Sequence, residues 1–248
     1  MSVLNNKPPV QLLDHTLRSA AENLALDEAL LDEAEQNPTP SEWLRLWEPP
    51  QPVVILGRSS QLESEVHTLR CRELGIEVLR RVSGGAAIVT GPGCLMYAVV
   101  LSLRARPRLR AIDAAHHLVL ETIAGAIRKL GLSVALRGTS DLTLANRKFS
   151  GNSLRVRRDN LLYHGTLLYD FPLELIAACL GRPPREPDYR AARAHHDFVT
   201  NLPARREDLR RVVIEAWQPV RESDAWPHAR VAELVASRYS RPEWNLRR

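Results

Sequence analysis

The chain has 248 residues, of which 44% are hydrophobic and 25% are charged. That length can bury a core without disulfides or a metal, and the composition is that of an ordinary globular protein, so a stapled mini-protein and a disordered chain are both excluded. No uncharged apolar run approaches the roughly 18 residues that a membrane helix needs, and residues 1–15 lack the pattern of a signal peptide. We therefore expect a folded, cytoplasmic protein without a membrane partner.

The charged residues single out one lysine. The formal net charge is +5, but 29 acidic residues are interleaved with 34 basic ones and only 5% of residues are aromatic, so the balance does not predict a nucleic-acid partner. Only three of the basic residues are lysines, namely Lys7, Lys129 and Lys148. Lys129 lies near the end of a predicted helix, where a cation is favourable. Lys148 lies in a strand pattern, where this arginine-rich chain would be expected to use arginine.

The first hundred residues predict one helix followed by several strands. Ser19 and Glu22 form a capping-box pattern, which opens a helix that reaches about residue 35. Extended, partly β-branched runs then predict three strands, at residues 43–47, 52–57 and 76–82. Residues 80–103 have the pattern of a strand, a glycine turn, a short strand, a second glycine turn and a strand that is buried on both faces.

A second helix separates this group of strands from another. Residues 112–130 carry apolar side chains at helical spacing, and Gly131 fits the residue that ends such a helix. Residues 134–171 return to short strands. Turns are predicted at Gly151-Asn152 and at Asp159-Asn160, as in a hairpin or meander.

The grouping of strands, with helices between the groups, favours an α+β fold with a mostly antiparallel sheet flanked by helices. After a helix that ends near residue 180, residues 181–203 contain four prolines and little periodicity, which predicts a functional lid or a mobile connection. Two amphipathic helices follow, at residues 206–217 and 227–239. We divide the chain into a compact unit, residues 1–203, and a short helical C-terminal extension, residues 204–248.

Two segments carry candidate binding groups. Residues 80–86, RRVSGGA, contain adjacent glycines that let backbone amides approach a ligand, and an arginine that can hold a phosphate or carboxylate. The alternative is a glycine turn beside two exposed arginines. Residues 147–152, RKFSGN, place Lys148 before a predicted small-residue turn, where an ammonium group could stabilise negative charge on a phosphate or an acyl oxygen. Here the alternative is a solvated lysine on an edge strand.

Other polar residues admit similar pairs of interpretations. His164, in YHGTLL, is either a functional group or a hydrogen-bonded structural histidine. Asp141 could bind magnesium or a nucleotide, or could cap a turn. Residues 195–197, HHD, do not predict a metal site, because adjacent side chains point in opposite directions. The odd number of cysteines, without CxxC spacing, predicts no disulfide framework, and we expect buried thiols at Cys71, Cys94 and Cys179.

The order of four motifs, RRVSGGAAIV, GTSDL, NRKFSGNS and YHGTLL, resembles the signature of the lipoate-protein ligase A family. The resemblance covers about residues 20–203. It implies the fold shared with biotin protein ligases and class II synthetase-like catalytic domains. It also implies a reaction in which ATP, with Mg²⁺, converts lipoate or octanoate to an acyl-adenylate, and the acyl group then passes to a lysine of a lipoyl-carrier domain.

The resemblance also implies roles for individual residues. Lys148 is expected to contact the acyl carbonyl and the α-phosphate, and is the implied catalytic residue. The loop that follows Arg81 is expected to hold the adenylate, His164 and Gly165 to line the acyl tunnel, and Asp141 to lie near the nucleotide or its magnesium. The implied binding residues are Arg81, Ser83, Gly84, Gly85, Ala86, Asp141, Ser150, Gly151, His164, Gly165 and Thr166.

The chain departs from the family pattern at Ala86, Ser140 and Tyr163, which replace glycine, asparagine and histidine. Only a short stretch follows residue 203, where bacterial ligases carry an accessory domain, so a separate accessory subunit is expected or the protein is an acyltransferase between carriers. The transferase alternative needs a nucleophilic cysteine, for which Cys94 is the remaining candidate. A biotin ligase is disfavoured because its glycine-arginine loop is absent, and a non-catalytic binder is disfavoured because Lys148 is retained.

Overall fold

A computed structural model describes residues 8–182 and 185–247, so Lys7 lies outside the described residues. Within these ranges the strands form two sheets. The main sheet has eight strands, in the spatial order β11 (Arg221–Glu222), β1 (Val10–Asp14), β2 (Glu42–Trp47), β6 (Cys94–Ser102), β10 (Asn160–Leu168), β9 (Arg147–Val156), β8 (Asp141–Leu144) and β7 (Val134–Arg137). The second sheet has three, in the order β4 (Glu77–Arg80), β3 (Val53–Leu56) and β5 (Ile88–Thr90).

Most neighbouring strands are antiparallel. The exceptions are β1, which runs parallel to both β2 and β11, and the parallel pair of β3 and β4. The predicted α+β class with a mostly antiparallel sheet is therefore confirmed. Neither β1 nor β11 was predicted from the sequence: β1 is a short run, VQLLD, without clear alternation, and β11 consists of two exposed residues.

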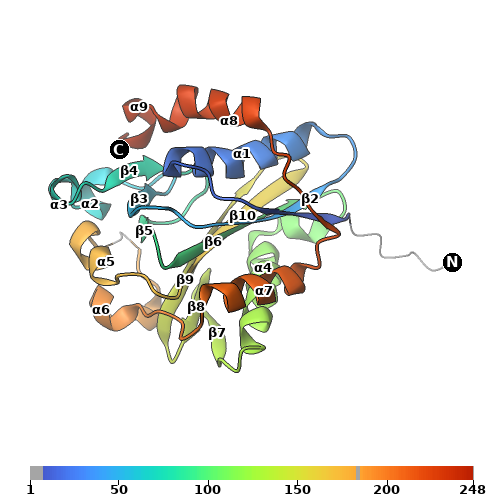
Figure 1. Cartoon of the computed structure of the whole chain (residues 1–248). Helices are drawn as coiled ribbons and strands as arrows, with labels where there is room; N and C mark the ends of the chain where they lie inside the picture. The colour runs from blue at the N-terminus through green and yellow to red at the C-terminus, as the bar shows by residue number, and fades with distance from the viewer. Residues whose placement is uncertain (1–7, 183–184, 248) are drawn as a thin grey trace.

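Helices cover both faces of the main sheet (Figure 1). The long helix α1 (Ala20–Gln36) lies on one face together with the small sheet, and α8 (His228–Leu234) packs on α1. The other face is covered by α4 (Ile112–Arg128) and α7 (Arg206–Trp217). The remaining short helices are α2 (Leu62–Glu65), α3 (Thr68–Glu73), η1 (Pro107–Arg110), α5 (Glu174–Cys179), η2 (Asp188–Arg190), α6 (His195–Phe198), the π-helical η3 (Val235–Tyr239) and α9 (Pro242–Asn245).

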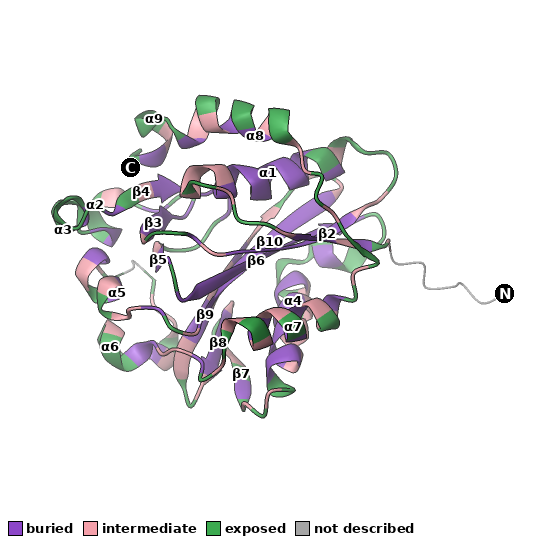
Figure 2. Ribbon diagram, in the orientation of Figure 1, coloured by how far each residue is buried: buried purple, intermediate pink, exposed green. Residues whose placement is uncertain are grey.

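Two hydrophobic cores follow from this layering, one on each face of the main sheet. Every residue of β6 and of β10 is buried, because both strands are covered on both sides (Figure 2). The predicted doubly buried strand after the second glycine turn is thus confirmed. The predicted capping box is also present, since the Ser19 side chain accepts from the amide of Glu22 and the Glu22 carboxylate accepts from the amide of Ser19.

The turn predicted at Gly151-Asn152 is wrong. Both residues lie inside β9, where Gly151 pairs with Asp141 and Asn152 pairs with Gly165. The chain reverses earlier, at Ala145 and Asn146, which both have positive φ. Small residues are present in β9 for a different reason. A Cβ atom on Gly151 would lie 3.0 Å from the Lys148 ammonium nitrogen, so the glycine makes room for the lysine.

The residues after 203 contact both layers of the fold. The helix α7 contributes Leu209 and Val213 to the core beside α4, and β11 extends the main sheet. At the other end of the molecule, the guanidinium of Arg80 donates to the carbonyl of Trp244, and the amide of Arg80 donates to Asn245 Oδ1. We keep the division at residue 203 as a proposal about organisation along the sequence.

A buried ion pair ties α1 to the main sheet. Arg45, in β2, is fully buried and donates to Asp27 Oδ1 of α1 at 2.5 Å. Its other contacts are the carbonyls of Asn23 and His15 and the Asn23 side chain. Burial by itself raises the pKa of Asp27, but the charge of Arg45 and the hydrogen bond with His164 outweigh burial, so the pKa lies below its ordinary value of 3.8.

We therefore expect Asp27→Ala to lower the free energy of unfolding by about 3–5 kcal/mol, because it leaves the Arg45 charge buried without a partner. A group with a lowered folded-state pKa stabilises the fold above its unfolded pKa, so this contribution is present above pH 3.8 and is lost as the pH falls through the lower folded value. Urea unfolding at several pH values measures it. Glu73→Ala, which breaks an exposed pair with Arg70, is the control and should change little. Equal effects of the two substitutions would contradict the prediction.

Candidate active site

Three cavities meet at Lys148, which lies on β9 close to the small sheet. The apolar cavity is lined mainly by Ile88, Val89, Phe149, Leu168, Ile176, Leu180, Phe198 and Val199. The inner cavity is lined by residues that include Leu24, Ile55, Arg81, Met96, Ser153, His164 and Gly165. The mouth is lined by residues that include Ser59, Ser60, Thr139, Ser140, Asp141, Arg185 and Glu186. Ala86 and Lys148 line all three.

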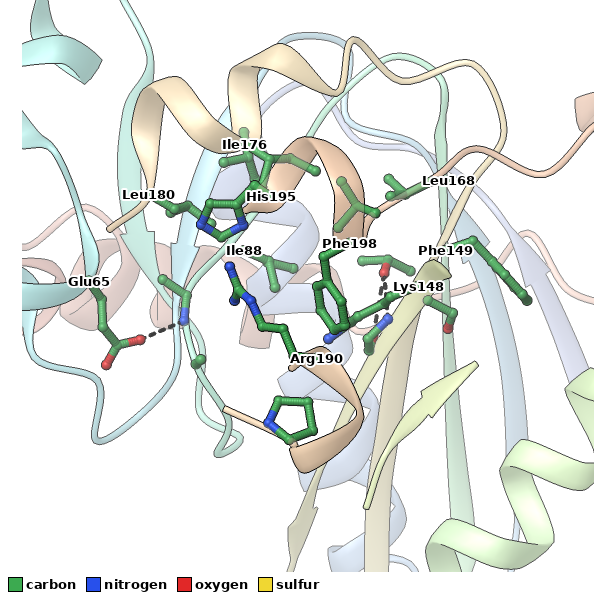
Figure 3. A pocket seen from close by; sticks show the side chains of 18 of the residues that line it. Glu65, Ile88, Lys148, Phe149, Leu168, Ile176, Leu180, Arg190, His195 and Phe198 are labelled. Atoms are coloured by element: carbon green, nitrogen blue, oxygen red, sulfur yellow. Dashed lines mark hydrogen bonds between the residues drawn. The ribbon is translucent and has the colours of Figure 1, made fainter. Parts of the chain in front are cut away.

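Lys148 is held by a carboxylate. Its ammonium nitrogen lies 2.7 Å from Asp141 Oδ1, and the hydroxyl of Tyr189 donates to Asp141 Oδ2 at 2.7 Å. The lysine side chain is 28% exposed, so it is open to the cavities and is not a solvated edge residue. Figure 3 shows Lys148 reaching from β9 toward the apolar cavity, with Ile88, Arg190 and Phe198 around it.

The glycine loop after β4 is organised by Arg81. This arginine is only 6% exposed, and its guanidinium donates to the carbonyls of Gly84, Ala86 and Ile55. Burial lowers its pKa to about 10, so it remains a cation at neutral pH. The alternative of a glycine turn beside exposed arginines is wrong, because Arg80 is also fully buried. Arg81 holds the loop through hydrogen bonds to its carbonyls and also lines the inner cavity.

A second carboxylate holds the other side of this loop. Glu65 accepts a hydrogen bond from the amide of Ala87 at 2.8 Å and another from the hydroxyl of Ser60 at 3.0 Å. The loop also touches the end of β3, since a Cβ atom on Gly57 would lie 1.8 Å from the carbonyl oxygen of Gly85. The loop is therefore fixed on both sides before any ligand arrives.

His164 belongs to a buried chain of polar groups. Its Nε2 hydrogen bonds with Ser83 Oγ at 2.5 Å, and its Nδ1 lies 3.3 Å from Asp27 Oδ2. Ser83 Oγ also lies 2.8 Å from Ser153 Oγ. His164 is thus a hydrogen-bonded structural histidine that also lines the inner cavity.

The structure brings most of the implied site residues together. The residues that line at least one cavity beside Lys148 are Arg81, Gly85, Ala86, Asp141, Ser150, Gly151, His164, Gly165 and Thr166. Ser83 and Gly84 are not among the lining residues: Ser83 is fully buried behind the loop, and Gly84 is exposed on it. The roles of all these residues toward a ligand stay predictions.

Sequence reasoning missed the roles of two residues that shape the site, Asn152 and Tyr189. Asn152 donates to the carbonyl of Ser140 and accepts from the hydroxyl of Tyr97, so it joins β9 to β6 and to the residue just before β8. Tyr189 comes from the proline-rich segment 181–203, which carried no motif. Apart from residues 183 and 184, this segment folds over the apolar cavity, to which it contributes Arg190, His195, Phe198 and Val199.

The departure at Tyr163 does not reach the cavities. Tyr163 is fully buried on the opposite face of β10, where its hydroxyl hydrogen bonds with His116 Nδ1 of α4 at 2.9 Å. Burial lowers the pKa of His116 and raises that of Tyr163. At the second departure, Ser140 lines the inner cavity and the mouth, and its backbone carbonyl accepts a hydrogen bond from Asn152.

None of the three cysteines lines the three cavities among the residues that the structure describes. All are buried, as expected, and burial raises the pKa of Cys71 and of Cys94 to about 12. Over residues 8–182 and 185–247, no three His, Cys, Asp or Glu side chains are grouped as metal ligands. In the same part of the chain no helix is long and apolar enough to cross a membrane.

In the described residues, the glycine loop and a lysine face each other at the junction of three adjoining cavities. The model of the lipoyl protein ligase A/B catalytic domain matches residues 19–216. The chain therefore belongs to that family, and the resemblance found in the motifs is confirmed.

Named relatives include both ligases and a transferase. The chain is 32% identical over 146 residues to a putative lipoate-protein ligase A of Aeropyrum pernix, and 28% identical over 182 residues to the lipoate-protein ligase LplJ of Bacillus subtilis. These alignments cover 59% and 73% of the chain but 52% of each relative, so the chain spans about half the length of these ligases. It is also 30% identical to the octanoyltransferase LipM of Carboxydothermus hydrogenoformans, over 76% of the chain and 78% of that protein.

Solved structures confirm the fold. A bipartite lipoate protein ligase of Thermoplasma acidophilum superposes with a TM-score of 0.82 at 23% identity, covering 97% of this chain and 98% of the other. A lipoate-protein ligase A bound with ATP superposes with a TM-score of 0.78 at 22% identity, covering 97% and 98%. At these identities the likeness establishes the fold of the catalytic domain alone.

The close approach of Gly57 to Gly85 gives a test of the loop's packing. We expect Gly57→Ala to cost about 1–3 kcal/mol of unfolding free energy, because the new methyl group meets a backbone carbonyl that cannot swing away. Gly125→Ala, in open space on α4, is the control and should stabilise the protein by about 0.5–1 kcal/mol. Chemical denaturation of both variants measures the difference. A neutral Gly57→Ala would show that the loop yields.

Proposed function

We propose that this chain is the catalytic domain of a lipoate-protein ligase. It activates lipoate or octanoate with ATP as an acyl-adenylate and transfers the acyl group to one lysine of a lipoyl-carrier domain. One observation carries this proposal. Lys148 lies at the junction of the three cavities, and its ammonium group contacts the carboxylate of Asp141. The ammonium group can exchange this contact for one to a ligand.

The chemistry needs a cation at such a junction. A free carboxylate is a poor acyl donor, so one of its oxygens attacks the α-phosphorus of ATP and pyrophosphate leaves. The amine of the carrier lysine then attacks the acyl carbonyl of the adenylate, AMP leaves, and the amine loses a proton. Negative charge develops near the same atoms in both steps. The Lys148 ammonium group is placed to stabilise it in each, while His164 and Gly165 line the inner cavity proposed for the acyl chain.

Mg²⁺ accompanies ATP in this proposal and would neutralise charge on the phosphates. Among the described residues near Lys148, Asp141 is the carboxylate suited to hold it, because hard cations prefer oxygen ligands. Both Asp141 oxygens already have partners, Lys148 and Tyr189. The phosphates and water would therefore supply most of the ligands of the ion.

A second candidate function is ATP-independent transfer of octanoyl or lipoyl groups between carriers. The match to the octanoyltransferase LipM favours it, since that alignment covers 78% of the relative, whereas the ligase alignments cover about half. The thiols disfavour it. Cys94 has no exposed surface and a pKa raised to about 12, which is the opposite of what a thiolate nucleophile requires.

The partner that we propose is a lipoyl-carrier domain, which supplies the acceptor lysine. The solved Thermoplasma ligase is described as bipartite and is accompanied by its E2 lipoyl domain. By analogy with that ligase, we propose that a separate accessory subunit completes this enzyme. We assign it no nucleic-acid or membrane partner, and we keep a cytoplasmic location as part of the proposal.

Substitution of Lys148 tests the function directly. With ATP, Mg²⁺ and lipoate or octanoate, pyrophosphate release and acyl-AMP formation are measured without a carrier. We expect Lys148→Ala to reduce the rate about 10²–10³-fold, because it removes the charge at the reacting atoms. Lys148→Arg should rescue little, since a planar guanidinium cannot occupy the same point. Turnover like that of the wild type by Lys148→Arg would overturn the assigned role, and a silent wild-type chain would point to a missing subunit or to the transferase.

Cys94→Ala separates the two candidate functions. If the protein is a ligase, the variant should keep the wild-type rate of acyl transfer to a carrier domain, because the thiol lies away from the cavities. If it is a thiol-dependent transferase, transfer from an acylated carrier should stop. The measurement is mass spectrometry of the acceptor carrier, with and without ATP. Loss of activity in a variant that still folds would overturn the ligase proposal.

A further inference from the structure

The hydrogen bond of Tyr189 to the Lys148–Asp141 pair has no role in the function proposed so far. Tyr189 lies in η2, within the segment that covers the apolar cavity, and is 48 residues away from Asp141 in sequence. Its hydroxyl takes one carboxylate oxygen of Asp141 while Lys148 takes the other, each at 2.7 Å. The orientation of the carboxylate is therefore set from two sides.

Residues 185–203, the segment that covers the apolar cavity, are hydrogen bonded to the strand that carries the lysine, and we call them the covering segment. The amide of Thr200 donates to the carbonyl of Lys148 at 2.9 Å, and Val199 forms a parallel bridge with the same residue. The neighbouring residue in β9, Arg147, donates from its guanidinium group to the carbonyls of His196 and Val199. The segment and Lys148 are thus connected through the backbone as well as through Asp141.

The aromatic ring of Tyr189 is held independently of its hydroxyl. The ring centroid lies 5.3 Å from that of Phe198, and the ring fills the space beside Gly138, where an added Cβ atom would lie 3.5 Å from Tyr189 Cε1. Burial, followed by the charge of Asp141, raises the pKa of Tyr189, so the hydroxyl keeps its proton and acts as a donor. Removing the hydroxyl alone therefore leaves the ring packed while it releases the carboxylate.

We propose that Tyr189 is a positioning residue for Lys148, acting through Asp141. Its hydroxyl holds the carboxylate in the rotamer that directs the lysine ammonium group to the junction of the cavities. The orientation of the Lys148 side chain consequently depends on the position of the covering segment, because Tyr189 belongs to that segment. This inference rests on the proposed function for its kinetic consequence, but the geometry of the pair can be measured without turnover.

The kinetic test is a double-mutant cycle with Tyr189→Phe, Asp141→Asn and the double variant. We expect Tyr189→Phe to lower kcat of adenylate formation about tenfold and to leave KM for lipoate and ATP nearly unchanged. In the Asp141→Asn background it should have no further effect, because its action passes through that carboxylate. Tyr169→Phe is the matched control: it removes a hydroxyl that donates to Glu48 at 2.9 Å, away from the cavities, and should leave kcat unchanged.

A merely structural role gives a different result. If Tyr189 only packs the covering segment, Tyr189→Phe keeps the ring and should leave kcat unchanged, or should raise KM with an effect that adds to that of Asp141→Asn. Either result overturns the proposal. If the wild-type chain forms no adenylate but moves acyl groups between carriers, the proposed function fails, and the same cycle is then read on carrier-to-carrier transfer.

A spectroscopic measurement tests the geometry whether or not turnover is observed. The chain has only three lysines, so protein with ¹³C at lysine Cε gives a simple spectrum in which Lys148→Arg identifies one signal. We expect Asp141→Asn to move that signal toward the position of the exposed Lys129, Tyr189→Phe to move it in the same direction, and Tyr169→Phe to leave it in place. A Lys148 signal unchanged by Tyr189→Phe would overturn the proposal.

Discussion

The arrangement of the site depends on one buried charge, the guanidinium group of Arg45. An arginine removed from water is costly unless its charge is paired and hydrogen-bonded, and here Asp27, the carbonyl of His15 and both the carbonyl and the side chain of Asn23 bind its two terminal nitrogens. The second oxygen of Asp27 faces His164, which in turn binds Ser83 at the start of the glycine loop. The helix α1, the strands β2 and β10 and the glycine loop are therefore positioned relative to one another by buried polar contacts.

Much of the fold could be predicted because its signals are local. The helices α4 and α7 lie where apolar periodicity placed them, and β6 lies where an unbroken apolar run predicted a doubly covered strand. The short strand β1 carries no such signal, since its place is set by parallel pairing with β2 after the whole of α1. Gly151 was misassigned for a related reason: a glycine that makes room for a lysine and a glycine that permits a turn look the same in a single sequence.

The candidate site divides in the same way. Lys148 could be found from composition, and Asp141 and His164 from their order in the motifs. The residues that orient them could not, because they come from distant parts of the chain: Asp27 is 137 residues from His164, and Tyr189 is 48 residues from Asp141. Neither is marked by its neighbours in sequence. The motifs supply the groups that face the cavities, whereas the groups behind them are defined only by the assembled fold.

The pair of Tyr163 and His164 shows what this separation means for a motif. Adjacent residues of β10 face opposite layers, so His164 is bound to α1 and the glycine loop, while Tyr163 is bound to His116 of α4. Position 163 is therefore governed by how a helix packs on the far side of the sheet, and position 164 by the cavity. The two neighbours in this doublet therefore meet different physical constraints, since Tyr163 must fit against a helix and His164 must fit a polar chain beside a cavity.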